Sequence, residues 1–301
     1  MTRSRRPLTG LLTAVGISGV GTRMTFLAVP WFVLTTTGSP TLTGGVAFAE
    51  MAPYVGVQAL GGPVIDRLGA KRTSVATDLV ASAAMAAVPA LYQLHLLSIA
   101  VLGCLVALAG SARGAGDASR DVLVPGVSEI AGTTLERSSG LYDGVSRIAQ
   151  LIGLPAAGGL VVLVSAANVL ALDAASFIVS GAVVLLAVPI AAQPDRSVES
   201  GAEAGGNYLT SLFEGLRHLK ADRLLLGIAL MVLVTNFLDQ AGGSVLFPVW
   251  AHRVMHSAAA FGLFGGAFSL GAVAGNALTT WLGTHMPRRS TYGIGFLIAG
   301  A

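Results

Sequence analysis

The sequence predicts an all-α protein that crosses a lipid bilayer many times. Only 11% of the 301 residues are charged, whereas 53% are hydrophobic, and the mean hydropathy is +0.75. Soluble domains carry about 25% charged residues, so this chain has too few charges to cover the surface of a soluble protein. Apolar runs long enough to span a bilayer as helices, about 20 residues each, recur along the chain. No useful length alternates polar and apolar residues as a membrane β-barrel would.

These apolar runs give the order of the expected helices. The first run follows three arginines, but it is too long for a signal peptide and lacks a small-residue cleavage site, so we expect it to be retained. Spans are expected at 8–36, 43–65, 73–92, 95–115, 138–164, 167–191, 223–250 and 258–282, with a ninth that begins near Ser290.

The Lys and Arg residues predict the orientation of the spans. The chain has 18 Lys and Arg residues, and 15 of them lie at the amino terminus or near alternate connections between spans, beginning with the connection after span two. The exceptions are Arg23, Arg147 and Arg253. Cytoplasmic connections attract Lys and Arg. We therefore expect a multi-pass protein of the cell membrane whose amino terminus and 61–72 connection face the cytoplasm.

A polar segment at 193–207, rich in Ser, Gly and acidic residues, is typical of a linker. Ungapped comparison of the flanking parts aligns Pro30 with Pro248 and Gly44 with Gly262. Parallel repeats of six helices are a transporter architecture. The expected parts are a six-helix bundle at 1–192, a cytoplasmic linker with an amphipathic segment at 193–222, and the start of a second bundle at 223–301.

The connection after span two concentrates charge in the sequence GGPVIDRLGAKR. It resembles the loop signature of the major facilitator superfamily, G-x-x-x-D-R-x-G-x-K/R-R/K, with Ala70 where a basic residue is common. The matching residues are Gly62, Asp66, Arg67, Gly69, Lys71 and Arg72. The stretches FLAVPWFVLTTTGSPTLTGG, LDAASFIVSGAVVLL, EGLRHLKADRLLL and VLFPVWAHRVM, together with Asp78, are similar to the drug- and siderophore-exporting members.

The resemblance implies a fold of two six-helix halves whose second half is incomplete here. We therefore expect a fragment of a longer protein; the alternative is a truncated, inactive product. The resemblance also implies that the loop is a gate that latches the halves. Gly62 would let its helix approach a neighbour, Asp66 would interact with a helix dipole, and Gly69 would permit a tight turn. The partners available to Arg67 and Arg72 are Asp78, Asp117 and Asp121. The alternative is an ordinary cytoplasmic loop, which needs the cations but neither Asp66 nor the glycines.

The fifth span, GVSRIAQLIGLPAAGG, resembles the exporter signature G-x8-G-x3-G-P-x2-G-G, with Leu154 in place of the glycine before the proline. The matching residues are Gly144, Gly153, Pro155, Gly158 and Gly159. Small residues and a proline predict a close-packed, bent helix. Generic close packing, without a role in export, is the alternative.

Charges inside spans are costly and usually face a cavity. Five are expected there: Arg23, Glu50, Asp143, Arg147 and Asp239. Asp143 and Arg147 are spaced to pair on one helical face; the alternative is that this pair is purely structural. Glu50 and Asp239 are candidates for reversible protonation, with permanent polar anchors as the alternative. Arg23 is a candidate counter-ion, or a contact for an anionic substrate.

Other chemistry finds little support. The chain lacks a phosphate-binding Gly-x-x-x-x-Gly-Lys-Ser/Thr loop and a positioned nucleophilic serine, so we expect no enzymatic activity. His252 and His256 have metal-compatible spacing, but no further ligand completes a site. Cys104 is the single cysteine and forms no intrachain disulfide. We expect neither metal nor cofactor.

The sequence therefore predicts a secondary transporter that exports amphipathic small molecules, of multidrug or siderophore type, in exchange for protons by alternating access. Expected partners are a small-molecule substrate, protons and the lipid bilayer; nucleic acid is not expected, and the protein is expected to be monomeric. The alternatives are a nutrient-uptake transporter of the same fold, or a membrane scaffold or partner subunit that transports nothing. Charges inside several spans favour transport, because a scaffold does not need them.

Overall fold

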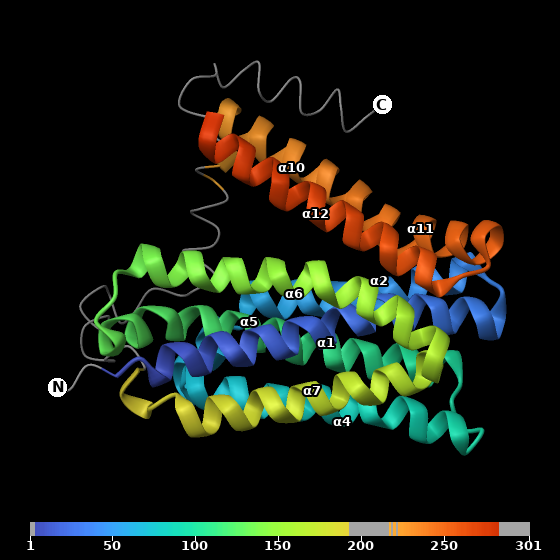
Figure 1. Ribbon diagram of the computed structural model, residues 1–301, viewed down its shortest axis with the longest axis horizontal. Coiled ribbons are helices and arrows are strands. Elements are labelled where there is room, and N and C mark those ends of the chain that lie inside the picture. The colour runs from blue at the N-terminus through green and yellow to red at the C-terminus, as the bar shows by residue number, and fades with distance from the viewer. Residues whose placement is uncertain (1–3, 193–216, 218, 221, 283–301) are drawn as a thin grey trace.

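The computed structural model describes residues 4–192, 217, 219–220 and 222–282, and every regular element in this part is a helix (Figure 1). The first group comprises α1 (Arg6–Thr37), α2 (Pro40–Leu60), α3 (Gly62–Leu68), α4 (Ala70–Gln93), α5 (Ile99–Ala131), α6 (Leu135–Val164), α7 (Ala166–Ala187) and the 3-10 turn η1 (Ile190–Ala192). The second group comprises α10 (Arg223–Ala241), η2 (Gly242–Leu246), α11 (Phe247–Trp250), η3 (Ala251–Met255) and α12 (Ala258–Leu282), in which η2 and η3 are π-helical.

Seven helical stretches of the described part are long and apolar enough to cross a membrane. They are α1, α4, α5, α6, α7, the continuous stretch Leu225–Met255 and the Ala258–Gly275 part of α12. The 21-residue helix α2 is not among them, but it packs along α5 within the first bundle. The predicted all-α membrane fold is confirmed.

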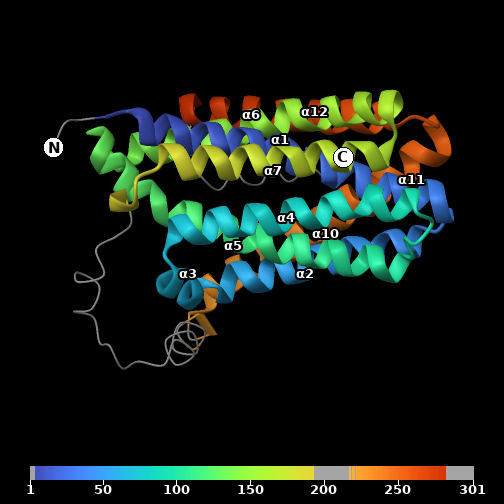
Figure 2. The ribbon, with the colours of Figure 1, turned by 90° about the horizontal axis from the view of Figure 1, so that it is seen from below.

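Within the first bundle, α1 packs along α6 and α7, α5 packs along α2 and α4, and α4 also packs along α7. Figure 2 shows α1, α6 and α7 on one side and α2, α4 and α5 on the other. Tight turns join several neighbours: Gly38 ends α1 with a φ of +66°, and Ser39 accepts a hydrogen bond from the Leu42 amide as the N-cap of α2. We call the end where α1 begins and α3 lies the α3 end, and the opposite end the α11 end.

The fourth predicted span differs most from the structure. We expected it to end at 115, but α5 continues to Ala131, so Arg113 and Arg120 lie inside a helix rather than at a cation-rich connection. The polar residues of this extension look like a loop in a hydropathy profile. They form a buried helix because their charges find partners on neighbouring helices.

The predicted second span is divided at Gly61 into α2 and the short helix α3. Of the expected linker at 193–222, residues 193–216, 218 and 221 lie outside the described residues, as does the ninth span expected from Ser290.

The second group of helices contacts the bundle mainly through α12, which packs on α6. Glycines make this contact close: a Cβ on Gly158 would lie 2.9 Å from Gly262 Cα. The described side chains of Leu225–Met255 remain largely exposed. In Figure 1, α10 and α12 diverge from α6 toward the α3 end.

Candidate functional site

Five charged residues are buried in the described part of the chain. They are Glu50, Asp78, Arg113, Arg120 and Asp173, and each lies in a helix of the first bundle. Most of these charged side chains lie between two clusters of buried apolar residues. One cluster surrounds Leu11 near the α3 end, and the other surrounds Leu27 nearer the α11 end. Buried charges need partners to offset the loss of hydration, so their contacts define the site.

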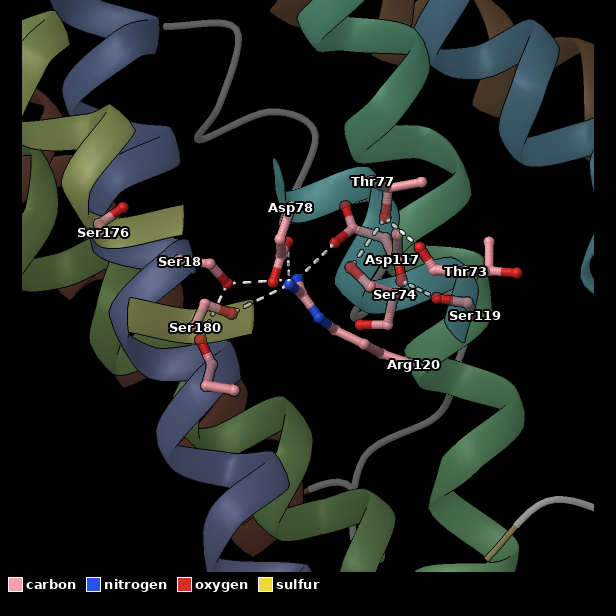
Figure 3. A network of polar contacts seen from close by, with 12 residues as sticks. Ser18, Thr73, Ser74, Thr77, Asp78, Asp117, Ser119, Arg120, Ser176 and Ser180 are labelled. Atoms are coloured by element: carbon pink, nitrogen blue, oxygen red, sulfur yellow. Dashed lines mark hydrogen bonds and ion pairs between the residues drawn. The ribbon is translucent and has the colours of Figure 1, made fainter. Parts of the chain in front are cut away.

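Arg120 of α5 connects four helices (Figure 3). Its Nη2 donates to Asp78 Oδ1 on α4 at 2.5 Å and to Ser180 Oγ on α7 at 3.1 Å. Its Nη1 donates to Ser18 Oγ on α1 at 3.2 Å. A weaker contact of 3.4 Å joins Nη1 to Asp117, one turn away on α5. Arg120 therefore fixes the relative positions of α1, α4, α5 and α7.

Small residues allow this approach. A Cβ on Gly181 of α7 would lie 3.3 Å from Asp78 Cβ, and a Cβ on Gly116 of α5 would lie 3.0 Å from Thr77 Oγ1 on α4. Both distances are tighter than ordinary van der Waals contact. The helices can therefore come close enough for the carboxylate and guanidinium to meet directly.

The second buried ion pair joins Glu50 of α2 to Arg113 of α5, and each side chain is only 5% exposed. The sequence of α5 explains the close approach: a Cβ on Gly110 or Gly114 would overlap the α2 backbone at Glu50 or Tyr54. This Gly-x-x-x-Gly spacing places both glycines on one helical face. One helical turn after Glu50 along α2, the Tyr54 hydroxyl donates to Asp117 Oδ2 on α5 at 3.1 Å.

Asp173 of α7 is fully buried and has different partners. The Thr25 hydroxyl of α1 donates to its Oδ2, and the Ser176 hydroxyl lies 3.3 Å from its Oδ1. Gly21 of α1 makes room for them, because a Cβ there would overlap both Ser176 and Asp173.

A polar cavity of about 320 Å³ adjoins the Arg120 network. Helices α1, α5 and α6 line it with Val15, Ser18, Gly19, Thr22, Arg23, Asp117, Arg120, Asp121, Tyr142, Asp143, Ser146 and Gln150. The lining combines three carboxylates, two guanidinium groups and several neutral hydrogen-bonding groups. Such a cavity can hold a small molecule with polar or charged groups.

The predicted gate residues lie at the α3 end. Gly62, Asp66 and Arg67 are in α3, while Lys71 and Arg72 begin α4. Between the two helices Gly69 has a φ of +86°, where L side chains are strained. A Cβ on Gly62 would meet no atom within 4 Å, so the close approach expected there is not seen in this conformation.

The Lys71 side chain reaches the end of α7, where its Nζ donates to the Leu185 carbonyl at 2.8 Å. The proposed gate partners are engaged within the bundle: Asp78 with Arg120, and Asp117 with Tyr54 and Arg120. Asp121 lines the polar cavity.

The structure separates the five in-span charges that the sequence suggested. Arg23 and Asp143 line the polar cavity, but Arg147 is not among its lining residues. Glu50 is in the buried ion pair with Arg113, whereas Asp239 on α10 is exposed. These five residues therefore do not form one cluster.

The glycine motif of the fifth span divides between two neighbours. A Cβ on Gly153 would lie 2.8 Å from Arg23 Cβ on α1, and Gly158 faces Gly262 of α12. Pro155 contacts Gly266 of α12. Gly144 and Gly159, in contrast, have no atom within 4 Å of a hypothetical Cβ, so close packing accounts for only part of the motif.

Sequence reasoning missed three central residues. Arg113 and Arg120 were expected near a loop because they follow a long apolar run. Asp173 was not singled out, although it is an isolated carboxylate in the apolar stretch LDAASFIVSGAVVLL. An unpaired charge inside a span is the signal that would have identified it.

Comparison with known proteins agrees with the fold. The model of the family described as the Major Facilitator Superfamily matches residues 11–301. The Multidrug efflux pump Tap of Mycolicibacterium fortuitum is 31% identical over 297 residues, which cover 97% of this chain and 71% of that protein. The Multidrug efflux pump Tap of Mycobacterium tuberculosis (strain ATCC 25618 / H37Rv) is 29% identical over 307 residues, covering 99% of this chain and 70% of that protein. Because the family match takes in both helical groups and the loop that first suggested the resemblance, the chain belongs to the major facilitator superfamily.

Proposed function

We propose that the protein exports amphipathic small molecules across the plasma membrane in exchange for protons, by alternating access. The observation that carries this proposal is the polar cavity beside the buried Arg120 network. Its carboxylates and guanidinium groups can contact the polar or charged part of a substrate. The relatives named as multidrug efflux pumps support export and a drug-like substrate class.

The domain organisation and orientation are parts of the same proposal. The 1–192 bundle and the second bundle that begins at 223 act as the two halves, and 193–222 links them on the cytoplasmic side, where the amino terminus also lies. The second group contacts the bundle near the α11 end and diverges toward the α3 end (Figure 1). With the α3 end in the cytoplasm, this corresponds to a conformation open to the inside.

The loop between α2 and α4 acts as the gate in this proposal. Lys71 already holds the end of α7 through the Leu185 carbonyl, and the positive-φ turn at Gly69 sets the direction in which α4 follows α3. Closing the halves would bring a second-half helix end toward Asp66, whose carboxylate would stabilise a helix N-terminus. Alternating access then needs proton and substrate to prefer different conformations.

Accumulation of lipophilic cations, macrolides and siderophores in a strain lacking its main exporters tests the function. We expect the full-length protein to lower accumulation, and to do so only while a proton gradient exists. A cavity variant, Asp121→Asn with Asp143→Asn, should raise the substrate concentration needed for half-maximal export, because two carboxylates of the cavity lining are replaced by neutral amides.

The control for the cavity variant is Glu129→Gln, which neutralises an exposed carboxylate of α5 that does not line the cavity. Accumulation that rises with expression would indicate uptake instead of export. The proposal would also fail if the cavity variant and the control behaved alike.

A further inference from the structure

The buried charges of the first bundle do not balance. Two cations, Arg113 and Arg120, and three anions, Glu50, Asp78 and Asp173, are buried in the described part of the chain. The cations pair with Glu50 and Asp78. Asp173 is thus the surplus anion, and none of the ion pairs found among the described residues includes it.

The side chains that hydrogen-bond to the Asp173 carboxyl group are neutral. Of the helices packed against α7, α1 contributes Thr25 and α4 contributes Met85, which contacts the Thr25 hydroxyl. No α6 group takes part in the described interactions of Asp173. The charged groups that act on it from farther away are Arg113 of α5 and Glu50 of α2, which already form a pair. An isolated ionised carboxylate is costly in such an environment, and the neutral acid is favoured.

The hydrogen bonds around Asp173 suit either protonation state. When Asp173 is ionised, the Thr25 hydroxyl donates to Oδ2. When Asp173 is protonated, its O–H can donate to Thr25 Oγ1, and the Thr25 hydrogen can turn to Met85 Sδ, 3.6 Å away. Ser176 is not needed as a donor to the carboxylate, because its hydroxyl donates to the Asp173 backbone carbonyl at 2.8 Å. Gaining or losing a proton therefore leaves no donor without an acceptor.

A groove of about 680 Å³, lined mostly by apolar side chains, lies between α1, α6 and α7. Gly21 and Ser176 form part of its wall, and both lie directly against Asp173. Gly21 and Ser176 therefore lie between the Asp173 carboxyl group and this groove.

We propose that Asp173 carries the proton of the transport cycle: it is neutral in the conformation described here, and it releases its proton in the opposite conformation of the cycle. This inference rests on the proposed proton-coupled export. The step breaks only the carboxyl O–H bond: the proton passes to water on one side of the membrane, and the carboxylate regains a proton on the other. Glu50, a candidate suggested by the sequence, is instead held in the buried ion pair with Arg113.

The test uses Asp173→Asn in the full-length protein, with Glu129→Gln as the control. Asn is neutral and of the same size as Asp, so it imitates the protonated state. In reconstituted vesicles we expect Asp173→Asn to reduce export driven by a pH gradient at least tenfold, while substrate exchange without a gradient continues. The control should keep both activities.

Infrared spectroscopy gives a readout that does not depend on transport. We expect the unmodified protein to show the carbonyl stretch of a protonated carboxyl group, and Asp173→Asn to abolish it. Retention of this band in the variant overturns the inference, as does failure of the variant to fold, because a neutral isostere should fit the neutral form.

Failure of the inference and failure of the proposed function are distinguishable. If pH-driven export exists and Asp173→Asn leaves it unchanged, the inference is wrong and the proposed function stands. If the infrared band depends on Asp173 but no proton-driven export occurs with the unmodified protein, proton coupling itself is wrong, and the role of Asp173 in transport falls with it.

Discussion

The α1–α7 bundle and the α10–α12 group are both built of apolar helices, yet different contacts hold them. In α1, α4, α5 and α7, 44% of the most apolar window is buried, compared with none in Leu225–Met255. Buried ion pairs join the helices of the first bundle. The second group rests on α6 through glycine backbones and small apolar side chains.

This difference predicts which contacts between helices are rigid and which allow movement. An ion pair buried between helices fixes their positions, because separating the partners would leave a charge unpaired in a dry interior. A contact made by glycines fixes only how closely two helices approach, so one can slide or tilt against the other at lower cost. We therefore expect the first bundle to move as a unit and the seam between α6 and α12 to accommodate the movement.

The largest effect should come from Arg120→Met, which leaves Asp78 buried without its cation. Breaking a buried pair in this way costs about 3–5 kcal/mol, so the midpoint of thermal unfolding in detergent should fall sharply. Adding Asp78→Leu to Arg120→Met removes the orphaned charge and should restore part of the loss. Lys71→Met, which removes only the contact with Leu185, is the control. Equal loss in Arg120→Met and Lys71→Met would show that the network does not hold the bundle.

Gly158→Leu should break the seam instead of the bundle. The added side chain would overlap the α12 backbone at Ala258 and Gly262, and overpacking costs about 1–3 kcal/mol. We expect export to be lost while the thermal unfolding of the first bundle changes little. Gly159→Leu is the matched control, because a Cβ at Gly159 meets no atom within 4 Å. Normal export by Gly158→Leu would exclude the seam as a site of movement.

Tyr54→Phe should weaken the α2–α5 contact slightly by removing the hydrogen bond to Asp117. The expected cost is about 0.5–1.5 kcal/mol, measured as a shift in the unfolding midpoint. Tyr92→Phe is the control, since the exposed Tyr92 keeps its edge contact with Phe32. A shift no larger than that of the control would mean that this hydrogen bond contributes nothing.

The smallest effect on stability should come from Asp239→Asn on the exposed helix α10. Surface substitutions of this kind usually stay within about 0.5 kcal/mol, so the unfolding midpoint should not change measurably. Marked destabilisation would show that Asp239 has a buried partner and that the contrast between the two helical groups is wrong.

The helical membrane fold was predictable, but the site was predictable only in part. Apolar runs locate most spans because bilayer thickness sets their length. The turn at Gly69 was predictable because glycine tolerates a positive φ. The ends of α5 and the position of Arg113 were not predictable. A hydropathy scale includes the cost of burying a charge but not the effect of a partner on another helix that offsets this cost.

By itself, the sequence determined that this chain is a helical membrane protein with a charged, glycine-containing turn after its second helix, since helix length and glycine geometry are local properties. Only the tertiary structure decided which charges neutralise one another. The partners of Arg120 come from helices up to about 100 residues apart in the chain. That pairing left Asp173 as the unmatched carboxylate, because charge balance is a property of the packed bundle and not of any one helix.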